Sequence, residues 1–125
     1  LQKRRDKRKK DREEKNEAYQ KERIRKIIWS AFDRCTYTKN STTYKLLGCD
    51  YETFKKHIER QFKKGMNWNN HNKWHYDHII PLASSNTISE FENLNHYTNF
   101  QPLWAIDNIK KSDKIIGGTQ VKLPL

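Results

Sequence analysis

The sequence has few cysteines and no long apolar run. Among its 125 residues, Cys35 and Cys49 carry the only thiols, and no Cys-x-x-Cys pair occurs. A four-thiolate zinc site is therefore excluded, and we expect no structural zinc. We expect both thiols to be reduced, as inside a cell, and leave a single disulfide open. Because no stretch of about 18 apolar residues is present, we expect no membrane-spanning segment and no membrane partner.

Apolar residues are also scarce. They make up 34% of the chain, below the roughly 45–50% of ordinary globular proteins, so part of the chain should lie outside any core. No apolar segment follows the charged N-terminal residues, which argues against a signal peptide and secretion. We expect an intracellular protein, in the cytoplasm or nucleoid of a host cell or encoded by a phage or virus. Because the sequence begins with Leu1 rather than Met, we also expect an upstream domain or a partner protein.

Positive charge is in excess. The chain has 26 Lys and Arg against 15 Asp and Glu, a formal net charge of +11, and residues 1–26 hold 13 of the basic and 6 of the acidic side chains. This balance favours an anionic partner, nucleic acid before an acidic membrane surface. We interpret residues 1–23 as a basic arm, helical or disordered, that follows phosphates; the alternative is a solubilising tail. The predicted phosphate contacts in the arm are Lys3, Arg4, Arg5, Lys7, Arg8, Lys9, Lys10 and Arg12.

Apolar spacing predicts two helices before the middle of the chain. Six residues recur at steps of three and four, which is typical of one buried helix face: Ile24, Ile27, Ile28, Ala31, Phe32 and Cys35. Residues 36–43 are polar and should form a loop, and Gly48 should close a short turn. Asp50 is a predicted N-cap for a helix that runs to Phe62.

The second half of the chain predicts a small sheet with a helix behind it. Strands are expected over 74–80 and 99–104, and a helix over 105–115 that Gly117 and Gly118 end. Ser89 and Glu92 have the spacing of a capping box for a short helix between the strands. We therefore predict an α+β fold with a domain at 24–118, a strand–strand–helix core at about 74–116, and a tail at 119–125.

This core holds the residue types that phosphodiester hydrolysis needs. The reaction requires a group that deprotonates water and a divalent ion that holds charge on the phosphoryl oxygens. His78 can be the base, and Asp77 and Asn108 offer hard oxygen ligands that suit Mg²⁺ or Mn²⁺ better than Zn²⁺. Because neighbours on a strand point to opposite faces, Asp77 and His78 serve one site only if the strand ends or kinks at His78.

At these residues the sequence resembles the HNH endonucleases, the family with the ββα-metal fold. The resemblance is to phage-type members without zinc-binding cysteines, and it covers roughly residues 74–114. It implies that Asp77 is a metal ligand, that His78 is the general base, and that Asn99 pins the loop between the strands. Asn108 takes the last position of the motif, which is often His. An Asp-His pair followed after 21 residues by Asn-Phe-Gln-Pro-Leu is far more specific than the pair alone.

Several neighbours of the motif have weaker assignments. His75 shares a strand face with Asp77 and is a candidate for the site or an ordinary strand histidine. For His96 we favour a structural hydrogen bond over ligation. Lys111 lies one helical turn after Asn108 and is a candidate to steady the scissile phosphate. Lys110 and Lys114 are expected to contact flanking phosphates or only water. Base stacking by Trp68, Trp74 and Trp104 is less favoured than a place in the core.

The sequence thus predicts a Mg²⁺-dependent endonuclease that acts on DNA and nicks one strand per active site. Two alternatives stay open. One is a nucleic-acid-binding module that does not cleave, since the charge and the aromatic residues would serve binding alone. The other is a ribonuclease of the same fold, since no residue pattern here separates DNA from RNA. The target site, the oligomeric state and the biological role cannot be predicted from the sequence.

Overall fold

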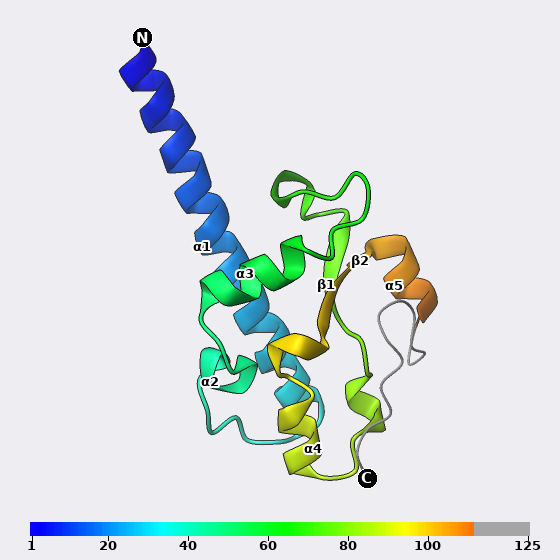
Figure 1. Cartoon of the computed structure of the whole chain (residues 1–125). Coiled ribbons are helices and arrows are strands. Elements are labelled where there is room, and N and C mark those ends of the chain that lie inside the picture. Colours follow the sequence, from blue (N-terminus) through cyan, green and yellow to red (C-terminus); the bar gives the residue numbers. More distant parts are fainter. Residues whose placement is uncertain (112–125) are drawn as a thin grey trace.

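The computed structural model describes residues 1–111, and the elements follow the chain in the order shown in Figure 1. The helices are α1 (Gln2–Arg34), α2 (Thr43–Leu47), α3 (Tyr51–Glu59), α4 (Ile88–Asn93) and α5 (Ala105–Lys111). The strands are β1 (Trp74–His78) and β2 (Phe100–Trp104), and short 3-10 turns lie at Trp68–Asn70, Leu82–Ser84 and Tyr97–Asn99. The predicted α+β class is confirmed. Lys114, the helix end after residue 111 and the tail at 119–125 lie outside the described residues.

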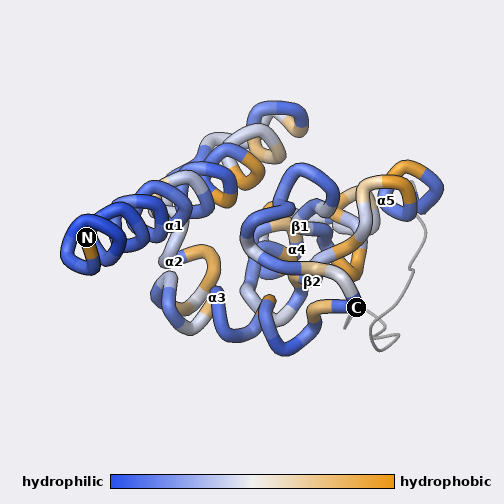
Figure 2. Tube along the Cα trace, turned by 90° about the horizontal axis from the view of Figure 1, so that it is seen from above, coloured by the Kyte–Doolittle hydropathy of each residue, from blue (hydrophilic) through white to orange (hydrophobic). Residues whose placement is uncertain are grey.

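The basic arm is helical and has no break at residue 23. A single helix, α1, carries both the arm and the predicted amphipathic segment, because the sequence from Gln2 to Arg34 contains no proline or glycine. The buried residues of α1 begin at Gln20, so its N-terminal half extends beyond the body of the protein (Figure 1). Figure 2 shows this half as hydrophilic along its length.

The core lies where the second half of α1 meets α3 and the sheet. Ile24, Ile28, Ala31 and Phe32 are buried as predicted, whereas Cys35 is exposed because α1 ends at Arg34. These side chains share one cluster with further buried residues from α2, α3, α4 and the two strands, namely Leu47, Phe54, Ile58, Trp74, Tyr76, Phe91 and Phe100. Trp74 is completely buried and Trp68 and Trp104 pack against the cluster, which supports the core assignment for all three.

Local signals end the helices largely where the sequence predicts. Gly48 follows α2 in the left-handed conformation with φ 74°, and the Asp50 carboxylate caps α3 by accepting from Thr53 N at 2.9 Å. Two predictions are wrong in position. The helix α3 ends at Glu59 rather than at Phe62, and α4 is capped by Thr87 rather than by Ser89. Thr87 Oγ1 accepts from Glu90 N at 3.1 Å, so the cap lies two residues earlier.

The sheet consists of two antiparallel strands. Tyr76 is paired with Pro102 and Asp77 with Gln101, and β1 ends at His78, which pairs with Phe100. Alternation places Trp74 and Tyr76 on the face that α1 and α3 cover, and His75 and Asp77 on the face that α5 covers. The end of β1 at His78 meets the geometric condition for Asp77 and His78 to serve one site.

Candidate functional site

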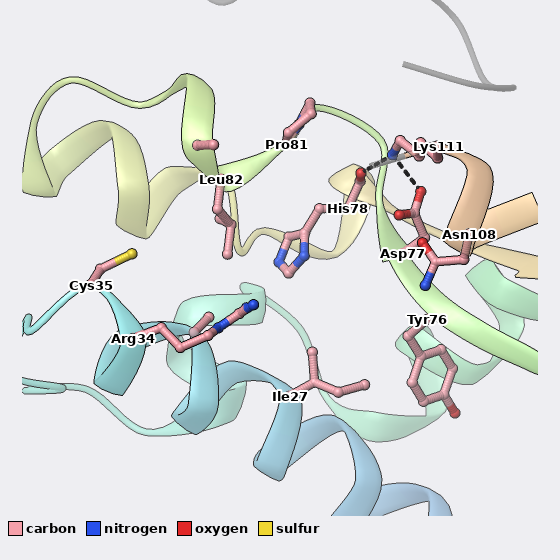
Figure 3. A pocket seen from close by; sticks show the side chains of 12 residues that line it. Ile27, Arg34, Cys35, Tyr76, Asp77, His78, Pro81, Leu82, Asn108 and Lys111 are labelled. Carbon is pink, nitrogen blue, oxygen red and sulfur yellow. Dashed lines mark hydrogen bonds and ion pairs between the residues drawn. The ribbon is translucent and has the colours of Figure 1, made fainter. Parts of the chain in front are cut away.

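The end of β1 opens into a cavity of about 410 Å³. It lies between the C-terminal half of α1, the segment after β1, and α5. Its polar lining includes all three residues that the sequence singles out for chemistry, Asp77, His78 and Asn108, together with Lys111 and Arg34. In Figure 3 the carboxylate, the amide and the ammonium group gather at one end of this cavity, and the His78 ring points into it beside them. The strand–strand–helix unit therefore brings distant residues to one site.

A buried asparagine fixes the tautomer of His78. Asn95 has no exposed surface, and its Nδ2 donates to the carbonyl of Phe91 at 2.9 Å. The Oδ1 of the same amide lies 3.0 Å from His78 Nε2 and can only accept, so His78 must donate from Nε2. The other ring nitrogen, Nδ1, then carries the lone pair. Burial lowers the pKa of His78 to about 4, which keeps the ring neutral at physiological pH.

Asp77 is buried in an ion pair with Lys111. Lys111 Nζ lies 2.6 Å from Asp77 Oδ2, and it also donates to the carbonyls of His78 at 2.5 Å and Ile79 at 3.3 Å. Gln101 Nε2 donates to the same carboxylate oxygen at 2.9 Å. Lys111 is 1% exposed and its ammonium group is bound to Asp77, so a contact between Lys111 and a scissile phosphate stays a prediction. The ammonium group is held inward because the Asp77 charge and two carbonyls surround it.

His75 lies against Asn108 and fixes the direction of its amide. The two side chains meet at 2.9 Å between Asn108 Nδ2 and His75 Nδ1. Burial lowers the pKa of His75, and the nearby Arg23 lowers it further, so the neutral ring accepts from the amide nitrogen. The amide oxygen of Asn108 is then left to face another group. His75 was a candidate either for the site or for an ordinary strand histidine, and the structure shows it in contact with Asn108, a predicted site residue.

Asn99 holds the segment that leaves β1. Its Oδ1 accepts from Ile80 N at 2.9 Å, and its Nδ2 donates to the carbonyls of Ile80 at 3.1 Å and Leu94 at 2.8 Å. The backbone adds a bond from Ile79 N to the Asn99 carbonyl at 2.8 Å. One side chain therefore joins both ends of the connection between the strands, which is the geometry expected of a residue that pins this loop.

Other predicted residues lie outside the cavity. His96 caps the turn Tyr97–Asn99 by accepting from Thr98 N at 3.4 Å, and the same ring nitrogen lies 2.8 Å from Thr98 Oγ1, so this side chain makes structural hydrogen bonds. Lys110 is exposed on α5, and the eight basic residues of the arm are exposed on α1. Sequence reasoning missed Asn95, Gln101 and Arg34. The antiparallel pairing of the two predicted strands could have indicated Gln101 as the neighbour of Asp77. No spacing rule points to Asn95 or Arg34, because both reach the site from other parts of the chain.

The donor atoms of the cavity fit a hard cation. Within residues 1–111 no group of three or more His, Cys, Asp or Glu side chains could hold a metal ion. Mg²⁺ does not need such a group, since it keeps several water ligands and binds through one or two protein oxygens. Asp77 and Asn108 supply oxygens of this kind, and three oxygens near Asp77 already surround the ammonium group of Lys111. Asp77 and Asn108 are therefore the residues of this cavity that could hold a hard cation.

Comparisons with known proteins identify viral relatives. The chain is 38% identical over 101 residues to an uncharacterized protein of Acanthamoeba polyphaga mimivirus, a match that covers 75% of this chain and 44% of the relative. A second uncharacterized mimivirus protein is 33% identical over 93 residues, with 63% of this chain and 41% of the relative covered. The chain thus spans less than half the length of these relatives. No protein-family model and no solved structure matches the chain.

Among the described residues, no helix is long and apolar enough to cross a membrane.

Proposed function

We propose that the chain is a divalent-metal-dependent endonuclease of the HNH type that hydrolyses DNA phosphodiester bonds. The observation that carries the proposal is the cavity at the end of β1, where Asp77 and His78 from this strand meet Asn108 from α5. Two further side chains support the proposal. Asn99 pins the strand connection, and Asn95 leaves His78 with a lone pair on Nδ1.

In the proposed reaction, His78 acts as the general base. Its Nδ1 takes a proton from a water molecule, and the water oxygen attacks the phosphorus in line with the 3′ oxygen. The bond from phosphorus to the 3′ oxygen breaks, and that oxygen takes a proton from solvent, which leaves a 5′-phosphate and a 3′-hydroxyl. Asn95 holds the His78 ring through Nε2, so the ring does not have to reorient when it becomes protonated. With one base in the cavity, one active site cuts one strand.

Asp77 and Asn108 would hold the metal ion. A bound Mg²⁺ or Mn²⁺ would stabilise the charge that develops on the phosphoryl and leaving oxygens. His75 orients Asn108 by accepting from its amide nitrogen, which directs the amide oxygen away from His75. Arg34, exposed at the opposite wall of the cavity, supplies a positive charge toward a phosphate.

The test is nicking of a supercoiled plasmid in Mg²⁺. The wild type should convert supercoiled to open circular DNA, and either EDTA or His78→Ala should abolish the conversion. His71→Ala is the matched control, because this histidine lies outside the cavity lining and bonds to the carbonyl of Trp68. Full activity of His78→Ala, or activity in EDTA, would contradict the proposed mechanism. Equal loss in His71→Ala would point to damage of the fold rather than of the site.

One observation favours a second candidate, a DNA-binding module that does not cleave. The Lys111 ammonium group already neutralises Asp77, so the carboxylate is satisfied without a metal ion. A folded wild type that binds DNA in EDTA and nicks no plasmid in Mg²⁺ or Mn²⁺ would favour this candidate. Labelled DNA and RNA duplexes offered together would separate the proposed nuclease from a ribonuclease.

Because both relatives are mimivirus proteins, we also propose that the chain is virus-encoded and acts inside an infected cell.

A further inference from the structure

One face of α1 is free of negative charge. Nine residues recur at steps of three and four from Arg5 to Arg34, and at 100° per residue they lie within about 80° of the helix circumference. They are Arg5, Arg8, Arg12, Asn16, Tyr19, Arg23, Lys26, Ser30 and Arg34, which we name the arginine stripe. It holds 6 basic and no acidic side chains. The rest of α1 holds 8 basic and 7 acidic side chains, which nearly cancel.

The arginine stripe leads into the candidate site. Arg34 lines the cavity that contains Asp77 and His78. Tyr19, Arg23 and Lys26 line a second cavity of about 450 Å³ beside it, and Ile27, Tyr76 and Asn108 line both. The stripe therefore passes along the two cavities and continues onto the N-terminal half of α1, which extends beyond the body (Figure 1).

Most of the positive charges of the stripe are available to a partner. Arg5, Arg8, Arg12, Lys26 and Arg34 are exposed. Arg23 is the exception, since it donates to the carbonyl of Trp74 and lies over the rings of Trp74 and Tyr76 at 4.9 and 4.7 Å. This contact anchors α1 on β1 and so fixes the direction of the stripe relative to the cavity. The ion pairs of α1 join residues off the stripe, Lys21 with Glu17 and Arg25 with Glu22.

We infer that the arginine stripe is a docking track for duplex DNA, which leads the duplex past the catalytic cavity. The inference rests on the proposed function for the identity of the ligand. From Arg5 to Arg34 the helix rises about 44 Å, at 1.5 Å per residue. That length matches about 13 base pairs of B-form DNA, and a straight, rigid row of cations fits a straight, rigid polyanion. The other faces of α1 lack this net charge, so they contribute little.

The track differs from a general basic arm in a way that an experiment can measure. In the triple variant Arg5→Gln/Arg8→Gln/Arg12→Gln, three stripe charges are lost. In the matched control Arg4→Gln/Lys7→Gln/Lys10→Gln, the same charge is lost from the same part of α1 on the other faces. All six residues are exposed, and glutamine favours helix as well as they do, so far-UV circular dichroism should be unchanged.

The measurement is the affinity for a 20-base-pair DNA duplex as a function of KCl concentration. Both triple variants are made in a His78→Ala background and assayed in EDTA, so that cleavage plays no part. The stripe variant should lose about 2.7 from the slope of log K against log[KCl], which is 0.9 for each lost phosphate contact. The control should keep most of the wild-type slope. Equal losses in the two variants would overturn the inference and leave only a general charge effect.

Competition experiments test the choice of ligand. A single-stranded DNA or an RNA duplex of the same length should compete at least tenfold less well than the DNA duplex. Equal competition by either would overturn the assignment of duplex DNA. The result is separate from the nicking test: a stripe-dependent slope with no nicking by the wild type would refute the nuclease and leave the track standing. If the wild type nicks the plasmid but the stripe variant and the control lose the same amount of salt slope, the nuclease stands and the docking track is refuted.

Discussion

Two amides control the chemistry of the candidate site at the scale of single residues. Asn95 has its amide direction set by the Phe91 carbonyl, and Asn108 has its direction set by His75. In the first case the lone pair of the His78 ring lies on Nδ1, and in the second the amide oxygen of Asn108 is directed away from His75. Neither selection depends on a flexible side chain, because both partners are held by secondary structure.

Asn95→Leu should slow nicking roughly 10- to 100-fold while the fold is kept. Leucine has the same branched arrangement of side-chain heavy atoms but accepts no hydrogen bond, so His78 loses the partner that sets its tautomer and ring angle. The loss should fall on kcat and leave KM for the plasmid almost unchanged, because Asn95 is buried and touches no substrate. Asn93→Leu is the matched control, since this exposed asparagine is the last residue of α4, two positions before Asn95. A rise in KM with unchanged kcat would contradict a positioning role.

Lys111→Met should destabilise the metal-free protein by about 3 kcal/mol, because Asp77 would keep a buried charge without its partner. If Asp77 is a metal ligand, Mg²⁺ should restore part of this stability, and the thermal midpoint of the variant should rise with Mg²⁺ more than that of the wild type. Thermal unfolding in EDTA and in Mg²⁺ measures the difference. Lys110→Met, on the exposed side of α5, is the control. Equal Mg²⁺ responses in all three proteins would argue against Asp77 as a ligand.

At the scale of elements, local signals in the sequence predicted much more than contacts between elements. Gly48, Asp50 and the apolar steps from Ile24 to Phe32 each act through their own backbone or one helix face, and each was placed correctly from the sequence. The α4 cap was misplaced because Thr87–Glu90 and Ser89–Glu92 have the same spacing, and the structure uses the first. The helix that continues through residue 23 was left open, since charge alone favours an exposed helix and a disordered arm equally.

The candidate site shows the same division. The resemblance supplied Asp77, His78, Asn99 and Asn108, and the structure brings the first, second and fourth to one cavity. Which groups hold these residues depends on long-range packing, and Asn95 reaches His78 from 17 positions away along the chain. The inward turn of Lys111 was missed because helical spacing shows that it shares a face with Asn108 but not that this face covers Asp77.

At the scale of the whole molecule, the protein consists of a small packed body and a long charged helix. The body buries its apolar residues around α1, α3 and the sheet, and it also buries polar groups that belong to the site. Burial lowers the pKa of His57, His75 and His78, so all three side chains are more easily protonated in the unfolded chain than in the folded protein. Stability and the candidate chemistry are therefore linked through pH.

The free energy of unfolding should fall as the pH is lowered from about 6.5 to about 4. Between the usual pKa of 6.5 and the folded value of about 4 for His78, the unfolded chain binds a proton that the folded protein does not. The stabilisation is thus present above pH 6.5 and is lost as the pH falls toward 4. The shift of His78 corresponds to about 3 kcal/mol, and His57 and His75 act in the same direction.

Urea unfolding at several pH values between 4 and 7, in EDTA, measures this dependence. His78→Gln should flatten the slope, because the side chain that takes up the proton on unfolding is absent. A slope that is the same in His78→Gln and the wild type would mean that His78 is not held neutral by burial. The cavity would then present an imidazole that is already protonated near pH 6, and His78 would be a poor acceptor for the proton of the attacking water.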